Sequence, residues 1–312
     1  MKALSIALLA LAIASSPARA VIPENWQEEQ LTNHPLVGRI FKIKPSIQPV
    51  AADDLREAIN GSVAIAIGEI HDNRDHHRIQ ARLIQALEAD DITVVFEMVP
   101  ERLQTVLDNP PSNMGALGEA LEWEARGWYT WDIYRPIFET TQAKKATLKA
   151  GAADVQVTRR ISKQGVEALT AEERAGLDLD TPLPEAEQAS LMKELAGAHC
   201  GMMPESALPA MASVQRFRDA KMAAEMNAAQ DKAVLIAGNG HTRRDRGVPF
   251  LMDRPVISIT LVEVVDGMTT ADAYGLVNDA GNPTADFVIF TPRAKRDDPC
   301  EAMREAMKNR TK

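Results

Sequence analysis

The chain has 312 residues, of which 45% are hydrophobic and 25% are charged. These are the proportions of a globular protein, so the composition excludes a wholly disordered or collagen-like chain. The net charge is −9, from 35 basic against 44 acidic residues, and no block of lysines or arginines offsets it. This balance argues against nucleic acid as the main ligand. Two cysteines are too few for a disulfide scaffold.

The first twenty residues have the pattern of a secretory signal peptide. Lys2 gives a positive start, residues 3–15 form an apolar run, and residues 18–20 read Ala-Arg-Ala, a small-residue cleavage site. The run is too short for a membrane-spanning helix, and Pro17 interrupts it. We therefore expect cleavage after Ala20.

The mature chain is expected to be soluble and exported, in the periplasm or secreted. Its first residue is Val21, and no cysteine lies near the cut, so a lipid anchor has no attachment residue. Later in the chain no apolar run approaches the roughly 20 residues that a transmembrane helix needs. In an oxidising compartment Cys200 and Cys300 could pair.

Hydrophobic periodicity predicts strands and helices that alternate at both ends of the mature chain. After an extended lead-in, we expect a helix at 53–60, a strand at 63–67, a helix capped by Asp72 or Asn73, a strand at 92–96 and a helix at 101–107. A run rich in Pro, Asn and Gly at 109–115 then breaks the pattern. From there to about 230 the chain reads as helices and loops, with a long helix at 208–226 and a strand predicted only near 155–157. Strands return at 233–237, 256–264 and 287–290.

This order predicts an α/β fold: a mostly parallel sheet flanked by helices, with a smaller inserted all-helical domain. The α/β domain is expected to be discontinuous, over 21–108 and 228–300. The helical insertion would then cover 109–227, and 301–312 would form a C-terminal tail.

Two similar motifs follow predicted buried strands. Gly68-Glu69-Ile70-His71 follows the strand at 63–67, and Gly238-Asn239-Gly240-His241 follows the strand at 233–237, with Arg243 two residues later. Glu97 follows a third strand in the same way. Because the carboxyl ends of parallel strands meet at one edge of a sheet, these side chains are expected to face one crevice. The candidate site residues are Glu69, His71, Glu97, His241 and Arg243.

Such a cluster suits three kinds of chemistry, and the residues alone leave all three open. Glu69, His71, Glu97 and His241 could form the ligand set of a divalent transition metal. A histidine beside a glutamate can orient water and relay protons in hydrolysis. Histidine and arginine can also hold a ligand's carboxylates. His76 and His77 begin the next helix and are interpreted as surface residues that could also reach the crevice.

A second informative stretch, 123–138, holds three of the four tryptophans and two of the three tyrosines. Trp131, Tyr134 and Phe138 fall at helical spacing and therefore share a face. One interpretation is a packing cluster, and the other is an aromatic-lined site with a phenol as iron ligand. The residue types by themselves favour packing.

In order along the chain, these motifs resemble the ChaN-like haem-binding uptake family, within the TIKI/TraB/erythromycin-esterase-like superfamily. The residues that carry the resemblance are Gly68-Glu-Ile-His-Asp-Asn with His76-His77, Phe96-Glu97-Met98, Trp131-Asp-Ile-Tyr134, Gln215-Arg-Phe-Arg-Asp219 with Met222-Ala223, Gly238-Asn-Gly-His241 with Gly247-Val-Pro249, and Phe290-Thr-Pro292 with Asp298-Pro-Cys300. The match runs from about 35 to 300. It implies an exported protein that binds haem or iron complexes, as a homodimer that encloses haem through tyrosine.

The resemblance makes Tyr134 the first candidate for the axial ligand, with Tyr129 in reserve and His199 as a candidate contact to a propionate. The chain departs from the family in having no lipidation cysteine, whereas ChaN-like proteins are often lipoproteins. The prediction is therefore a haem-binding protein of iron acquisition, with haem iron as its cofactor.

The alternative is a hydrolase of an ester or amide, because the wider superfamily includes hydrolases that use the same elements. Glu69 or Glu97 would be the general base, His71 and His241 metal ligands or acid–base partners, and Arg243 an oxyanion or carboxylate clamp. A metal-dependent form would need a divalent transition metal. The sequence has neither a Gly-x-Ser-x-Gly elbow nor a His-Glu-x-x-His helix, so it supports neither standard serine nor zincin chemistry. A third hypothesis is a scaffold that inherits its polar crevice.

Overall fold

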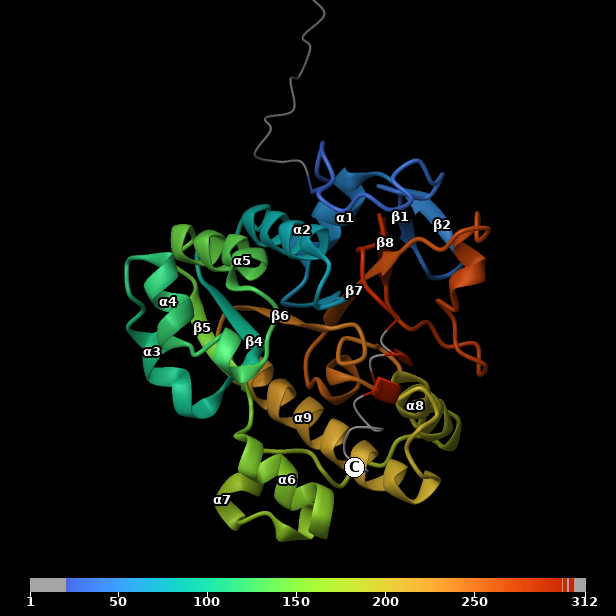
Figure 1. Cartoon of the computed structure of the whole chain (residues 1–312). Coiled ribbons are helices and arrows are strands. Elements are labelled where there is room, and N and C mark those ends of the chain that lie inside the picture. The colour runs from blue at the N-terminus through green and yellow to red at the C-terminus, as the bar shows by residue number, and fades with distance from the viewer. Residues whose placement is uncertain (1–20, 299, 302, 306–312) are drawn as a thin grey trace, which may run out of the picture.

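The structure is a computed structural model that describes residues 21–298, 300, 301 and 303–305 (Figure 1). The proposed signal peptide lies outside the described residues. An eight-stranded sheet forms the centre, in the order β2-β1-β8-β7-β3-β6-β4-β5. The strands are β1 (Ile40–Lys42), β2 (Gln48–Val50), β3 (Ala64–Glu69), β4 (Ile92–Pro100), β5 (Thr147–Ala152), β6 (Lys232–Gly238), β7 (Val256–Glu263) and β8 (Phe287–Thr291).

The sheet is mostly parallel, as the sequence predicted. Strands β3 to β8 pair in parallel, and only β1 runs antiparallel to its neighbours β2 and β8. Strands β3, β4 and β8 are buried along their whole length. They read as continuous apolar runs because layers of protein cover both faces of the sheet.

Helices lie on both faces of the sheet (Figure 1). They are α1 (Ala52–Gly61), α2 (Arg74–Gln85), α3 (Gln104–Asp108), α4 (Met114–Ala120), α5 (Trp131–Ala143), α6 (Val155–Gln164), α7 (Ala171–Arg174), α8 (Glu185–Ala198) and α9 (Leu208–Ala228). On one face, α1, α2 and α5 pack in a hydrophobic core against large residues of the sheet such as Ile65 and Ile67. On the other face α9 packs against small residues such as Ala64 and Ala66. Because side chains alternate along a strand, β3 presents isoleucines to one layer and alanines to the other.

Helix α2 begins where the sequence predicted, because Asn73 caps it. The Asn73 side-chain oxygen accepts from the backbone N–H groups of Asp75 and His76, which the first turn of a helix leaves without an internal partner. The Asn73 amide group donates to Glu263 at 2.8 Å and to the carbonyl of Pro292 at 3.1 Å. The cap therefore also ties the start of α2 to the end of β7.

The stretch 109–227 is not all-helical, which corrects the predicted insertion. Its residues Thr147–Ala152 form β5, which pairs in parallel with β4 at the edge of the sheet. The predicted strand at 155–157 is instead the first turn of α6. The sequence Thr-Leu-Lys-Ala-Gly-Ala is short and poor in β-branched residues, so its intrinsic β propensity is low. Pairing with β4 therefore determines that this segment is a strand.

Cys200 and Cys300 form a disulfide bond. It joins the turn after α8 to the C-terminal segment, 100 residues away along the chain. Over the described residues, no helix is long and apolar enough to cross a membrane.

Candidate functional site

The carboxyl edge of the sheet brings the two glycine–histidine motifs together. Glu69 at the end of β3 pairs in register with Gly238 at the end of β6, and Glu97 lies in the adjacent strand β4. A Cβ atom added to Gly238 would lie 2.9 Å from His71 Nε2 and 3.6 Å from Glu97 Oε2. Gly238 is therefore the point at which two clusters of charged side chains meet, and a side chain there would separate them.

The first cluster faces α2 and α5 and is centred on Glu69, which is buried. Its Oε1 atom accepts a hydrogen bond from the Tyr134 hydroxyl at 2.8 Å and lies 2.7 Å from His71 Nδ1. Its Oε2 atom lies 3.7 Å from Nε2 of His77, a buried side chain whose ring lies 3.9 Å from the ring of Tyr134. Among the described residues neither nitrogen of His77 has a hydrogen-bond partner.

The electrostatics of this cluster keep Glu69 ionised. Burial alone would raise the pKa of Glu69, but the positive charge that His77 gains at acid pH and the hydrogen bond from His71 outweigh it and lower the pKa. Burial alone would lower the pKa of His71, yet its hydrogen bond to Glu69 and the charge of Glu97 raise it. Burial lowers the pKa of His77 to about 4, so this ring is neutral near pH 7.

The second cluster faces α9 and is centred on Glu97. Its Oε1 atom accepts from Arg218 Nη2 at 2.6 Å and lies 3.2 Å from His241 Nε2. Its Oε2 atom accepts from the backbone N–H of Gly238 at 2.6 Å. On the far side of His241, Nδ1 lies 2.6 Å from the buried carboxylate of Asp219. The result is a chain of alternating charges from Asp219 through His241 and Glu97 to Arg218.

Each charge in this second cluster depends on its neighbours. Burial alone would raise the pKa of Glu97, but His241 and Arg218 hold it well below its usual value. Burial alone would lower the pKa of His241, but Glu97 and Asp219 raise it to about 9. Burial raises the pKa of Asp219, and His241 offsets only part of that effect. His241 is therefore an imidazolium at neutral pH, held between two carboxylates.

His76 and His77 are both buried, so their interpretation as surface residues is wrong. His76 Nδ1 accepts from the backbone N–H of Ile70 at 2.8 Å, which leaves Nε2–H to donate to Thr291 Oγ1 at 2.9 Å. Burial lowers the pKa of His76 to about 3. His76 is thus a neutral structural ring that fixes the loop between β3 and α2.

The two candidate tyrosines have opposite surroundings. Tyr134 has no exposed surface, its hydroxyl donates to Glu69, and burial raises its pKa. Its phenol oxygen is thus held inside the protein by Glu69. Tyr129 is 52% exposed, and burial followed by the charge of Asp72 raises its pKa. Its neighbour Trp128 lies edge-on to His71, with ring centres 5.1 Å apart. The aromatic stretch and the glycine–histidine cluster are therefore contiguous.

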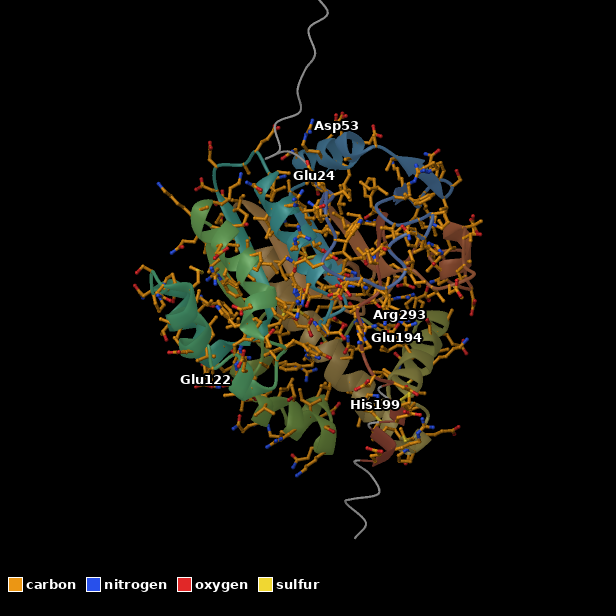
Figure 2. The ribbon with its side chains drawn as sticks, turned by 45° about the horizontal axis from the view of Figure 1, so that its top comes forward. Glu24, Asp53, Glu122, Glu194, His199 and Arg293 are labelled. Atoms are coloured by element: carbon orange, nitrogen blue, oxygen red, sulfur yellow. A yellow bond between two sulfur atoms is a disulfide. The ribbon has the colours of Figure 1, made fainter. Side chains whose placement is uncertain are left out.

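Two other predicted site residues lie elsewhere. Arg243 points to Asp245, with Nη2 2.6 Å from its carboxylate, and does not join either cluster. His199 ends α8, and its Nδ1–H donates to the carbonyl of Leu195 at 2.8 Å. Figure 2 shows His199 far from Glu122, which lies beside the aromatic stretch.

The four residues predicted as metal ligands do not form one metal site. His71 Nδ1 lies 2.7 Å from Glu69 Oε1, and His241 Nε2 lies 3.2 Å from Glu97 Oε1, so the four side chains pair two by two in separate clusters. Over the described part of the chain, no group of three or more His, Cys, Asp or Glu side chains is arranged to hold a metal ion.

Sequence reasoning missed Arg218 and Asp219 as site residues. Both lie on α9 between the buried residues Phe217 and Ala220. Arg216 and Lys221 lie close by on the same helix, so no local charge pattern distinguished Arg218 and Asp219 in the sequence.

Comparison with known proteins gives one family match. The family model described as haem-binding uptake, Tiki superfamily, ChaN, matches residues 55–251, which is more than half of the chain. No curated protein matches the chain.

Among solved structures, one described as cofacial heme binding to ChaN of Campylobacter jejuni is similar with a TM-score of 0.62 at 19% identity, over 80% of this chain and 95% of that one. An erythromycin esterase, EreC, in its open conformation has a TM-score of 0.43 at 12% identity, over 80% of this chain and 95% of that one. The type III effector HopBA1 has a TM-score of 0.42 at 16% identity, over 77% of this chain and 92% of that one.

Proposed function

The chain belongs to the ChaN family of haem-binding uptake proteins, and we propose that it binds haem through the phenol of Tyr129. The carrying observation is the exposure of this tyrosine at the edge of the aromatic stretch, beside Trp128 and close to Asp72. Tyr134, the ligand favoured by motif position, is enclosed and hydrogen-bonded to Glu69. Iron ligation by Tyr134 would require the cluster around Glu69 to open and α5 to move.

The donor set at this surface suits haem. A phenolate is a known axial ligand of ferric haem, and indole rings give a flat apolar contact surface for a porphyrin. When bound, haem would supply a ferric iron, which the phenolate of Tyr129 would hold. Trp128 would orient the macrocycle.

We also propose that the protein is exported and works as a homodimer. Residues 1–20 have the signal-peptide pattern, and the Cys200–Cys300 disulfide suits an oxidising compartment. A second copy placed over the exposed Tyr129 and the half-buried Trp128 would enclose a haem that one copy leaves open. Size-exclusion chromatography with and without hemin tests this, because a mass that stays monomeric on saturation contradicts it.

An absorbance titration with hemin tests the ligand. Wild-type protein should give a saturable Soret band with a tyrosinate-type charge-transfer feature. Tyr129→Phe should remove that feature and weaken binding by about tenfold or more, because it deletes the ligand atom.

Tyr134→Phe is the matched control, since it deletes the other phenol of the same stretch. It should leave the tyrosinate feature in place and the affinity within about twofold. The reverse pattern, with loss in Tyr134→Phe alone, would show that Tyr134 is the ligand. Linear, unsaturable binding by the wild-type protein would reject the haem-binding function.

A second candidate function is metal-independent hydrolysis of an ester or amide. The observation that favours it is the Glu69–His71 pair: a buried carboxylate holds Nδ1 of a partly exposed imidazole at 2.7 Å. This arrangement orients Nε2 as a general base. In an ester-hydrolysis screen, His71→Ala should abolish any turnover and leave haem affinity almost unchanged. Turnover that survives His71→Ala would exclude this pair as the catalytic base.

A further inference from the structure

One oxygen of the Glu69 carboxylate is not used by the contacts described above. Oε1 lies against Tyr134 and His71, whereas Oε2 is buried and has no hydrogen-bond partner among the described residues. Both ring nitrogens of His77 and the Oε1 atom of Gln80 share this condition. Because buried polar atoms are nearly always paired, a group of four unpaired ones indicates a hydrogen bond that these side chains are placed to form.

The three side chains meet where α2 packs on β3. His77 and Gln80 are three residues apart on α2 and share one helix face. Gln80 Nε2 donates to the carbonyl of Ile67 at 3.2 Å. Glu69 follows Ile67 by two residues on β3, so both strand side chains point to the same face of the sheet. Glu69, His77 and Gln80 are all buried.

Only His77 can donate in this interface. Glu69 is ionised, because its pKa is lowered, and a carboxylate only accepts. The Gln80 amide has its nitrogen on the Ile67 carbonyl, so its oxygen is an acceptor too. The neutral His77 ring carries one N–H group, either at Nε2 or at Nδ1. The tautomer of this ring therefore decides which acceptor receives a hydrogen bond.

Distance and charge both favour Glu69 as the acceptor. Nε2 of His77 lies 3.7 Å from Glu69 Oε2, and a small rotation of the ring brings the two atoms to the roughly 2.7–2.9 Å of a charge-assisted hydrogen bond. An ionised acceptor also forms a stronger hydrogen bond than a neutral amide oxygen. With its proton on Nδ1, the ring would instead turn the lone pair of Nε2 toward a carboxylate.

We propose that His77 is a positioning residue of the Glu69–His71 pair, as the Nε2–H tautomer that donates to Glu69 Oε2. The carboxylate is then held at both oxygens, by Tyr134 and His71 at Oε1 and by His77 at Oε2. It cannot rotate without losing a hydrogen bond, so it keeps Nδ1 of His71 in place and Nε2 oriented as the base. This inference deepens the second candidate function, on which its catalytic meaning rests.

NMR of the ¹⁵N-labelled wild-type protein at pH 7 tests the tautomer, because the shifts of the ring nitrogens distinguish Nε2–H from Nδ1–H. The His77 ring is identified by its contact with the Tyr134 ring, whose centre is 3.9 Å away. We expect the neutral Nε2–H form. The Nδ1–H form, or a ring that is charged at pH 7, would overturn the proposal.

Two substitutions of His77 test the positioning role. His77→Leu removes the donor, so the charge of Glu69 acts more strongly on His71 and raises its pKa. More of His71 is then protonated at pH 7, and turnover of 4-nitrophenyl acetate should fall by about tenfold, with the acid limb of its pH profile moved to higher pH. His77→Gln keeps an N–H donor, so it should retain the wild-type pKa of His71 and turnover within about threefold.

Gln80→Met is the matched control, because it removes the other unpaired acceptor of the same buried interface. It should change neither the His77 tautomer nor the pKa of His71. Equal changes of the His71 pKa in His77→Leu and Gln80→Met, or no change in His77→Leu, would overturn the positioning role. If the tautomer and the His71 pKa behave as expected but the wild-type protein hydrolyses no ester, the second candidate function is rejected and the His77 assignment stands.

Discussion

At the scale of single residues, the site is organised by charged side chains that lie next to side chains of opposite charge. Asp219, His241, Glu97 and Arg218 alternate in sign across the sheet edge. A buried charge without a partner costs several kcal/mol, so the buried Glu97 and His241 stay ionised because each lies beside a group of opposite charge. His76 and His77 are the opposite case. They are buried without a sufficient anionic partner, so both rings are neutral near pH 7.

These two kinds of histidine predict a stability maximum near pH 6.5. His241 has a folded-state pKa of about 9 against an ordinary value of 6.5. Its contribution is complete below pH 6.5 and is lost as the pH rises through 9, in total on the order of 3 kcal/mol. His76 and His77, lowered to about 3 and about 4, bind protons more readily when unfolded. Stability therefore also falls as the pH drops below 6.5. Urea denaturation from pH 4 to 9.5 measures both limbs.

Each limb of that profile has its own check. His77→Leu removes one titrating group and should flatten the acid limb by up to about 1.4 kcal/mol per pH unit. An NMR titration should find the His241 ring still charged at pH 8. If this ring loses its proton near pH 6.5, the alternating-charge account of the second cluster is wrong.

At the scale of elements, short apolar runs predicted most strands, and capping residues predicted where α2 begins. Contacts between elements were not predictable in the same way. On α4, a Cβ added to Gly118 would lie 2.7 Å from the ring of Trp131 on α5. The close approach of these two helices therefore depends on the absence of a side chain, which no hydrophobic pattern records.

Gly118→Ala should accordingly destabilise the protein by about 1–3 kcal/mol, because the added methyl group collides with an aromatic ring in a packed core. Gly197→Ala is its matched control: it lies in α8 and its Cβ would meet nothing within 4 Å. That change should be neutral or stabilise by up to about 1 kcal/mol, because alanine favours helix over glycine. Urea denaturation compares them, and equal effects would contradict the packing argument.

At the scale of the whole molecule, two connections hold distant parts of the chain together. The sheet draws β3 and β4 from the first third of the sequence into register with β6 and β7 from the last. The disulfide then closes a 100-residue loop between Cys200 and Cys300. Such a crosslink acts mainly by restricting the unfolded chain.

Replacing both cysteines by serine should therefore lower the free energy of unfolding by about 2–4 kcal/mol. Denaturation of wild-type protein with and without a reducing agent should give a similar difference, and the double variant should not respond to reduction. A double variant as stable as the oxidised wild-type protein would show that the disulfide contributes little to stability by restricting the unfolded chain.

By itself the sequence determined the parallel α/β class, the strands that carry the glycine–histidine motifs, and the family, because buried-strand runs and their terminal residues are local signals. It also placed Glu69, His71, Glu97 and His241 at one edge of the sheet. Only the tertiary structure decided that β5 joins the sheet, that Tyr134 is buried against Glu69 while Tyr129 faces solvent, and that Arg218 and Asp219 complete the second cluster. These outcomes depend on which residues distant in sequence pack together. A helix face has the same sequence pattern whether it packs against a carboxylate or lies in water.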